Sequence, residues 1–253
     1  MELPNSLDNA IKNLTNEPSK GIGTTLNDIW YLVFGFVSHA ADKKRLRYAN
    51  DLESYYSELS TAISNIPPER KTEPSFQTTA QALENSKYCI SEKELRQLFT
   101  NLISGTMDSS VSPYIHPSFA EIIKQMSPTD AKLLQKFPLK SFVAVADYIK
   151  TNTETSDFSI ELSNVCFPND FDIFQACNSL SSLNRLGLVA LDTESHLSDE
   201  NAYNDFFQTD FFKYFSKEVC SNRLNQKADI RKYVAKLTPL GQNFVYSCVI
   251  SRK

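Results

Sequence analysis

Apolar and polar positions in the first half of the chain follow a helical period. From residue 25 to about residue 63, apolar residues recur at three- and four-residue intervals, interrupted by the charged run at 42–45. This pattern predicts one long helix or two. Prolines at 67, 68 and 74 then require a non-helical link, and further helices are expected at about 75–89, 92–106 and from 118. We therefore expect an all-helical domain over residues 1–126.

Hydroxyl residues placed three positions before a carboxylate mark the expected helix starts. Such a pair can satisfy the free backbone N–H groups of a first helical turn reciprocally. The chain holds four of these capping boxes: Thr25–Asp28, Ser91–Glu94, Ser118–Glu121 and Ser127–Asp130. By the same reasoning, Thr238 followed by Pro239 predicts the start of the last helix.

After residue 127 the pattern indicates strands as well as helices. A helix is expected at 128–137, and the β-forming run at 142–149 is separated by a polar stretch, 151–156, from residues 158–162, which alternate with period two. These two segments predict a hairpin. A helix from about 170 to 186 ends at Gly187, and a short strand at 188–191 follows.

The last part of the chain predicts a helical insertion at roughly 199–218, a returning strand at 231–237 and a closing helix after Thr238. This order is typical of a winged helix-turn-helix with an enlarged wing. The predicted fold is therefore mainly α with a small α+β part: a helical domain over 1–126 and a winged-helix-like α+β domain over 127–253, with a helical insertion in the wing.

Composition excludes several classes of protein. With 41% apolar residues, 22% charged residues and a net charge of −4, the chain is an ordinary globular protein rather than a disordered, collagen-like or purely coiled-coil one. Five cysteines lie far apart in apolar runs, which favours reduced, buried thiols. The start of the chain lacks the features of a signal peptide, and its most apolar run, 29–37, is far shorter than the ~20 residues of a membrane span. We predict a cytoplasmic protein without a transmembrane segment.

Motifs for common catalytic or cofactor sites are missing from the sequence. The three histidines, at 39, 116 and 196, have no metal-ligand spacing, so we predict no metal site and no cofactor. Gly21 and Gly23 lack the rest of a nucleotide-binding motif and are interpreted as linker. Asp170 and Asp172 could be paired metal ligands, but a helix first turn capped by Asn169 explains them better.

Asp108 and His116 are weak catalytic candidates because they bracket a polar loop. If the loop brought them together, they could act as an acid–base pair. The structural alternative, which we favour, is that Asp108 caps a turn and His116 simply precedes a helix.

Charge bears on the winged-helix prediction. Residues 151–212, which include the presumed recognition helix, hold eleven acids and one base, Arg185, whereas residues 213–253 hold nine bases and two acids. An acidic surface is repelled by the phosphates of DNA. We therefore favour charge compensation within the protein over DNA binding, for which Arg185, Arg231 and Lys232 would be the contacts.

Aromatic residues are concentrated in the predicted insertion, with seven between 203 and 215. On one helix they would spread over more of the circumference than a single core-facing stripe covers. The candidate partner-binding residues are Phe207, Phe211, Phe212 and Phe215. The alternative is a kinked insertion wedged between the two domains. The aromatic run 29–34 raises the same question, and there we expect burial in the helical bundle rather than a membrane-surface role.

Several segments resemble the abortive infection alpha family of bacterial proteins. They are the stretch Ala82–Tyr88, the stretch Glu94–Phe99 with Leu102–Ile103, Met107–Asp108 ahead of His116–Phe119, Ile122–Pro128, Leu183–Leu188 and Leu237–Gly241. The similarity spans most of the chain from about residue 25 and is most specific at 82–130. It implies a role in defence against bacteriophage and carries over no catalytic residues.

The predicted function is that of a non-enzymatic interaction protein in abortive-infection defence. Its partner would be a phage or host protein, or a second copy of the chain. One alternative is a winged-helix DNA-binding regulator, although nucleic acid is a disfavoured partner. The other is a small hydrolase or nuclease using Asp108 and His116.

Overall fold

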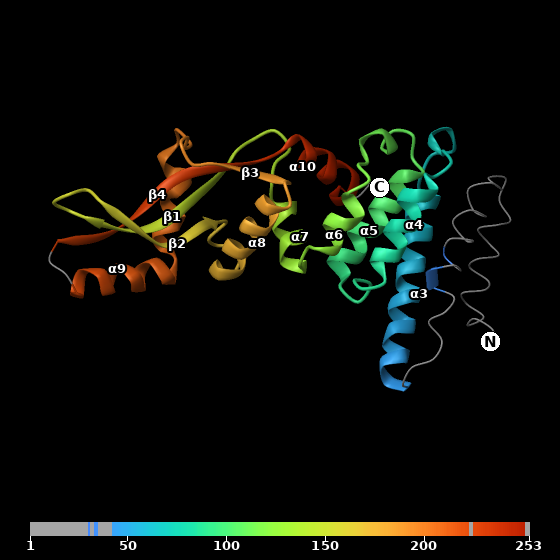
Figure 1. Ribbon diagram of the computed structural model, residues 1–253, viewed down its shortest axis with the longest axis horizontal. Coiled ribbons are helices and arrows are strands. Elements are labelled where there is room, and N and C mark those ends of the chain that lie inside the picture. The colour runs from blue at the N-terminus through green and yellow to red at the C-terminus, as the bar shows by residue number, and fades with distance from the viewer. Residues whose placement is uncertain (1–29, 31–32, 35–41, 223–224, 251–253) are drawn as a thin grey trace. The chain divides into compact units, whose positions relative to one another are not determined.

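The computed structural model describes residues 30, 33–34, 42–222 and 225–250 (Figure 1). The chain divides into two compact units, Met1–Ala131 with Asn243–Lys253, and Lys132–Gln242. The sequence pattern places a boundary after residue 126, whereas the division falls after residue 131. The end of the last helix, which the pattern assigns to the second domain, groups with the first unit.

The first unit is helical. It contains α3 (Asp42–Ser64), α4 (Phe76–Ser86), α5 (Lys93–Thr106) and α6 (Phe119–Lys124), with short 3₁₀ turns at Pro68–Arg70 and Ser112–Tyr114. Helix α5 lies at the centre, in contact with α3, α4, α6 and the C-terminal segment η4 (Val245–Val249). Eleven of its 14 residues are buried. The expected helices at 75–89, 92–106 and from 118 are thus confirmed, each within a few residues.

The described part of the aromatic run near residue 30 belongs to the helical core. Trp30 and Phe34 are only 3% and 5% exposed. The Trp30 ring centroid lies 4.5 Å from that of Phe34 and 5.1 Å from that of Tyr56 on α3. These rings are therefore buried in the bundle, as expected. The box Thr25–Asp28, the linker at 21–23 and the histidine at 39 lie outside the described residues.

Only some of the predicted capping boxes form. At Ser127 the box is complete: the Ser127 backbone N–H donates to Asp130 Oδ2 at 2.9 Å, and the Asp130 N–H donates to Ser127 Oγ at 3.1 Å. This box starts α7 (Pro128–Gln135). The box at Ser91 is wrong, because α5 begins after Glu92, whose side chain makes no capping hydrogen bond. Thr238 caps the last helix, α10 (Pro239–Phe244), since its Oγ1 accepts from the Gly241 N–H at 2.9 Å.

The second unit is built on a four-stranded antiparallel sheet in the order β2-β1-β4-β3. The strands are β1 (Val143–Asn152), β2 (Phe158–Cys166), β3 (Val189–Asp192) and β4 (Gln226–Leu237). Strands β1 and β2 form the predicted hairpin, with Ile149 opposite Ile160, and β1 pairs along its length with β4, so that Asp147 lies opposite Arg231. The unit is therefore an α+β domain.

Helices follow the hairpin and separate the last two strands. Helix α8 (Ile173–Arg185) ends at Gly187, whose φ of +74° is the left-handed conformation that a helix stop favours. Between β3 and β4 the predicted insertion forms two pieces, a 3₁₀ segment η3 (Glu200–Gln208) and α9 (Asp210–Asn222). The break between them lets one aromatic-rich segment present different faces to the sheet.

No helix in the described residues combines the length and apolar character that crossing a membrane requires.

Candidate functional site

Asp108 lies directly after α5 and is 2% exposed. Arg70 contacts both of its carboxylate oxygens: Nε donates to Oδ1 at 3.0 Å and Nη2 pairs with Oδ2. Ser110 donates to Oδ1 through its backbone N–H at 2.9 Å and its Oγ at 2.7 Å. Burial alone would raise the pKa of Asp108, but the bonds from Arg70 and Ser110 outweigh it and hold the pKa below its ordinary value. A carboxylate held in this way is a weak proton acceptor.

His116 is exposed, and it is held by its neighbour in the chain. Its Nδ1 lies 2.7 Å from Ser118 Oγ and accepts from the Ser118 backbone N–H at 3.2 Å. The structure shows no hydrogen bond or ion pair between His116 and Asp108, both of which it describes. As in the structural alternative, Asp108 organises a turn and His116 precedes α6.

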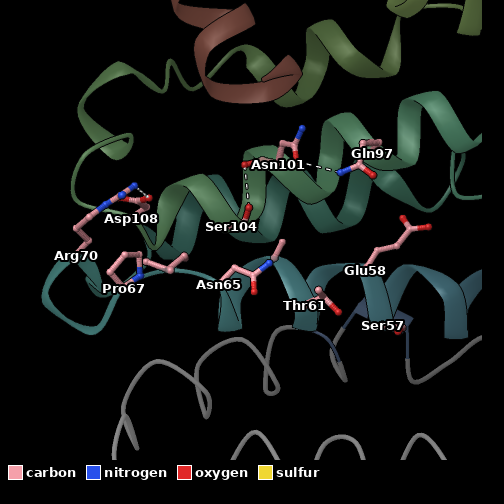
Figure 2. Close-up of a pocket in the computed structure, with 12 residues that line it drawn as sticks. Ser57, Glu58, Thr61, Asn65, Pro67, Arg70, Gln97, Asn101, Ser104 and Asp108 are labelled. Atoms are coloured by element: carbon pink, nitrogen blue, oxygen red, sulfur yellow. Dashed lines mark hydrogen bonds and ion pairs between the residues drawn. The ribbon is translucent and has the colours of Figure 1, made fainter. Parts of the chain in front are cut away.

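Asp108 instead closes one end of a cavity of about 430 Å³ in the first unit (Figure 2). One wall is α3 and the turn after it, the other is α5, and nine of the twelve lining residues have polar side chains. We call this cavity the polar groove; its lining consists of Ser57, Glu58, Thr61, Ala62, Asn65, Ile66, Pro67, Arg70, Gln97, Asn101, Ser104 and Asp108.

Ion pairs and hydrogen bonds of side-chain amides hold the groove in shape. Arg96 donates to the Glu58 carboxylate through Nη2 at 2.8 Å and through Nε at 3.1 Å. Its Nη1 donates to the Ile90 carbonyl at 2.8 Å. Gln97 Nε2 donates to Asn101 Oδ1 at 3.1 Å. The Asn101 amide in turn donates to the carbonyl of Cys248 at 2.8 Å. Glu58 and Asp108 are thus paired with arginines, and the other polar residues of the lining carry amides or hydroxyls.

The groove was not predicted from the sequence, although α5 carries a signal for it. Gln97, Asn101 and Ser104 stand at intervals of four and three residues, which places them on one face of the helix, and Asp108 continues the spacing just beyond its end. Three of them are under 8% exposed. A polar stripe of this kind could have been recognised by its period, but not its partner α3, which tertiary packing supplies.

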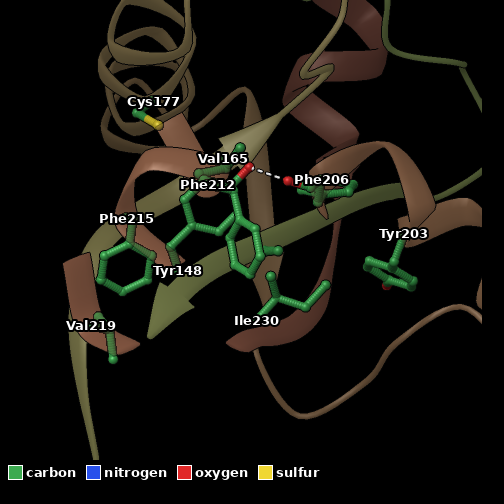
Figure 3. Packing of buried hydrophobic residues seen from close by; sticks show 10 residues of the cluster. Tyr148, Val165, Cys177, Tyr203, Phe206, Phe212, Phe215, Val219 and Ile230 are labelled. Carbon is green, nitrogen blue, oxygen red and sulfur yellow. Dashed lines mark hydrogen bonds between the residues drawn. The ribbon is translucent and has the colours of Figure 1, made fainter. Parts of the chain in front are cut away.

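Two of the four predicted partner-binding residues lie in the core of the second unit. Phe212 and Phe215 are 8% and 3% exposed and pack in one cluster with Tyr148 of β1 and Ile230 of β4 (Figure 3). Tyr148 also donates from its hydroxyl to the Phe206 carbonyl at 2.7 Å, which ties the insertion to the sheet. Phe212 and Phe215 are therefore core residues, because the break in the insertion folds them onto the sheet. Phe207 and Phe211 are half-buried at its edge.

Three aromatic side chains of α8 and α9 lie at the surface or half-buried beneath it, and two of them are in ring contact. Phe174 and Tyr214 are 52% and 69% exposed. The Phe174 and Phe211 rings meet at right angles with centroids 5.5 Å apart, and Phe211 stacks on Tyr148 at 5.8 Å. We call Phe174, Phe211 and Tyr214 the aromatic surface cluster. Of these three residues, only Phe211 is among the predicted partner-binding residues; Phe174 is on α8, far from α9 in the chain.

Two of the three predicted DNA-contacting residues, Arg231 and Lys232, form ion pairs with acidic side chains. The Arg231 guanidinium donates to Asp147 Oδ2 through Nε at 3.1 Å and Nη2 at 2.6 Å, and Asp147 is 1% exposed. Lys232 forms an ion pair with Glu200 in the insertion. The Lys232–Glu200 pair joins the basic stretch to the acidic one, whereas Asp147 lies before the acidic stretch. Arg185 is exposed in the last turn of α8.

The two acids near the start of α8 also have structural partners. Asp172, not Asn169, is the N-cap of the helix, because its Oδ1 accepts from the Gln175 N–H at 3.0 Å. Asp170 pairs with Lys136 at 3.1 Å. The body of α8 contains no acidic residue and one base, Arg185, so its exposed side is not acidic. Over the described ranges, no three or more acidic, histidine or cysteine side chains are grouped to hold a metal ion.

Fold and side chains together define a two-part protein, with a helical unit that carries a polar groove and an α+β unit that carries an aromatic surface. The model of the family described as abortive infection alpha matches residues 47–248. This match covers most of the chain, and the protein belongs to that family. The family links the chain to abortive infection, a bacterial defence against phage. No curated protein and no solved structure matches the chain significantly.

Proposed function

We propose that this protein is a non-enzymatic interaction protein in abortive-infection defence, and that the aromatic surface cluster binds its protein partner. The observation that carries the proposal is the exposure of Phe174 and Tyr214, while other rings of the insertion are folded into the core. Aromatic side chains are enriched at protein interfaces, where they bury a large area at a small cost in conformational entropy.

The cluster is well placed for this role because its central ring is already held. Phe211 stacks on Tyr148, whose hydroxyl is in turn bonded to the Phe206 carbonyl. A ring fixed before binding loses little freedom when a partner arrives, so more of the contact energy appears as affinity. The partner is a phage or host protein, or a second copy of the chain.

The two alternative functions, a DNA-binding regulator and a hydrolase, have weaker support. A DNA-binding regulator would need Arg231 and Lys232 to leave Asp147 and Glu200 before they could meet phosphates. A hydrolase would need Asp108 as a base, yet that carboxylate accepts hydrogen bonds on both oxygens and its pKa is lowered.

The test is the double variant Phe174→Ser with Tyr214→Ser in the full chain, expressed in cells that are then challenged with phage. We expect protection to be lost while the circular dichroism melt stays within a few degrees of the parent, since both side chains are largely exposed.

The matched control is Phe76→Ser with Tyr88→Ser, which removes the same two ring types at exposures of 60% and 74% in the first unit. It should keep protection. Light scattering of parent and variant chains distinguishes a second copy from another partner. Full protection by the Phe174–Tyr214 variant would contradict the proposed function.

A further inference from the structure

We propose that the polar groove between α3 and α5 binds an extended, uncharged polar peptide segment. Three side chains that line the groove are almost completely buried: Asn101 and Ser104 on α5, and Asp108 just beyond it, expose 7%, 6% and 2%. Each is fixed by a hydrogen bond within the chain, since Asn101 donates to the Cys248 carbonyl, Ser104 Oγ donates to the Asn101 carbonyl and Asp108 accepts from Arg70. Buried polar groups that are hydrogen-bonded in this way give the groove a defined shape before any ligand arrives.

The groove is open along α3 and long enough for a short strand. Ser57, Thr61 and Asn65 line it from the α3 side and are exposed. Along α5 and the turn after it, the groove runs from Gln97 to Asp108, which at the helical rise of about 1.5 Å per residue is about 16 Å. An extended chain advances about 3.3 Å per residue, so about five residues span this length. The volume of about 430 Å³ lies within the range of ligand sites in proteins.

The charges of the groove argue against a charged ligand. Glu58 is paired with Arg96 near one end, and Asp108 is paired with Arg70 at the other. An anion would compete with Asp108 for Arg70, and a cation would compete with Arg96 for Glu58. The lining itself carries two acids and one base, and Arg96 behind Glu58 balances the remaining negative charge, so each charged group already has a partner.

Amide groups give the groove its chemistry. Asn and Gln side chains donate and accept through one planar group, as a peptide bond does. Gln97 and Asn101 on α5 already use one N–H each, toward Asn101 Oδ1 and the Cys248 carbonyl. The second N–H of each amide, Gln97 Oε1 and the amide of Asn65, directly after α3, would meet the alternating N–H and C=O groups of an extended backbone. No aromatic ring lines the cavity among the described residues, so a nucleobase or sugar would find no stacking surface there. In the bound peptide, polar side chains such as those of Ser, Thr, Asn and Gln could form hydrogen bonds with the hydroxyls of Ser57, Thr61 and Ser104.

This inference is independent of the proposed function. The polar groove belongs to the first unit, whereas the aromatic surface cluster belongs to the second. Loss of either binding activity leaves the other measurable.

The experiment uses the full chain and three libraries of pentapeptides blocked at both ends. One library is built from Ser, Thr, Asn, Gln and Gly, and the other two replace two positions with Asp and Glu or with Lys and Arg. Adenosine and maltotriose are added as uncharged small molecules. Retention on the protein is measured by size-exclusion separation followed by mass spectrometry.

Thr61→Trp places an indole in the groove from an exposed position of α3. Its matched control is Ser54→Trp, which is exposed two helical turns earlier and does not line the cavity. We expect the uncharged library to be retained at least tenfold more by the parent and by Ser54→Trp than by Thr61→Trp. Asn65→Ala with Gln97→Ala, which removes two amides without changing charge, should weaken binding about tenfold.

The proposal is overturned if no peptide is retained, if charged libraries are retained as well as the uncharged one, or if Thr61→Trp retains as much as the parent. Retention of adenosine or maltotriose without any peptide would also refute it, because the ligand would then be a small molecule. If Thr61→Trp fails to fold, retention of the uncharged library by the Asn65→Ala, Gln97→Ala variant is compared with retention by the parent, and equal retention overturns the proposal.

Discussion

Phe212→Ala is expected to cost about 3–5 kcal/mol of unfolding free energy, the usual range for truncating a buried Phe to Ala. The Phe212 ring is 8% exposed, and its centroid lies 5.1 Å from that of Tyr148 and 5.2 Å from that of Phe207. Truncation leaves a cavity between the insertion and the sheet that these rings cannot fill without moving. Tyr214→Ala, two residues along the same helix, removes a ring that is 69% exposed and should change stability by about 0.5 kcal/mol or less.

Urea unfolding followed by circular dichroism measures both variants. With a urea dependence of about 2 kcal/mol per molar, the Phe212→Ala midpoint should fall by about 1.5–2.5 M and the Tyr214→Ala midpoint by about 0.3 M or less. Equal losses in the two variants, or a loss below about 1 kcal/mol for Phe212→Ala, would refute the assignment of Phe212 to the core and return it to the partner surface.

Three further changes test other parts of the structure. Gly241→Ala should lower stability by about 2 kcal/mol or more in a thermal melt, because an added Cβ would lie 1.9 Å from the Leu188 carbonyl oxygen, a backbone atom; an unchanged melt would contradict this packing. Asp108→Asn should be less stable than the parent at pH 7. Because the folded-state pKa of Asp108 lies below the ordinary 3.8, the parent's advantage is present above that pH and fades as the pH falls below it, so melts that differ equally at pH 7 and pH 3 would argue against it. Native protein should react with a thiol reagent at one cysteine, the exposed Cys220, and Cys220→Ser should abolish the fast reaction, whereas several fast thiols would show that the other four are accessible.

Local chemistry accounts for most of the secondary structure that the sequence predicts. The helix expected at 92–106 is found at Lys93–Thr106, and the hairpin expected from 142–149 and 158–162 is found in β1 and β2. Helical period, period-two alternation and proline positions are properties of neighbouring residues, so they can be read without knowing the fold. Caps are less predictable, because they depend on the exact residue at which a helix begins. Asp172 rather than Asn169 caps α8 for this reason.

The candidate sites depended on contacts that no local pattern contains. The polar stripe on α5 is visible in the sequence, but the groove exists only because α3 packs opposite it. Phe174 joins Phe211 only because α8 and α9 meet, and the aromatic insertion divides into buried and exposed rings only where it lies on the sheet.

By itself the sequence determined the helices, the hairpin, the balance of charges and the family, since each rests on residue type and spacing along the chain. Tertiary structure alone decided what those residues do. Arg231 pairs with Asp147, 84 positions away, and Arg70 pairs with Asp108, 38 positions away. The candidate DNA contact Arg231 and the candidate catalytic residue Asp108 are therefore both members of ion pairs within the protein. Burial and charge pairing are set by neighbours in space, and those neighbours are chosen only when the chain folds.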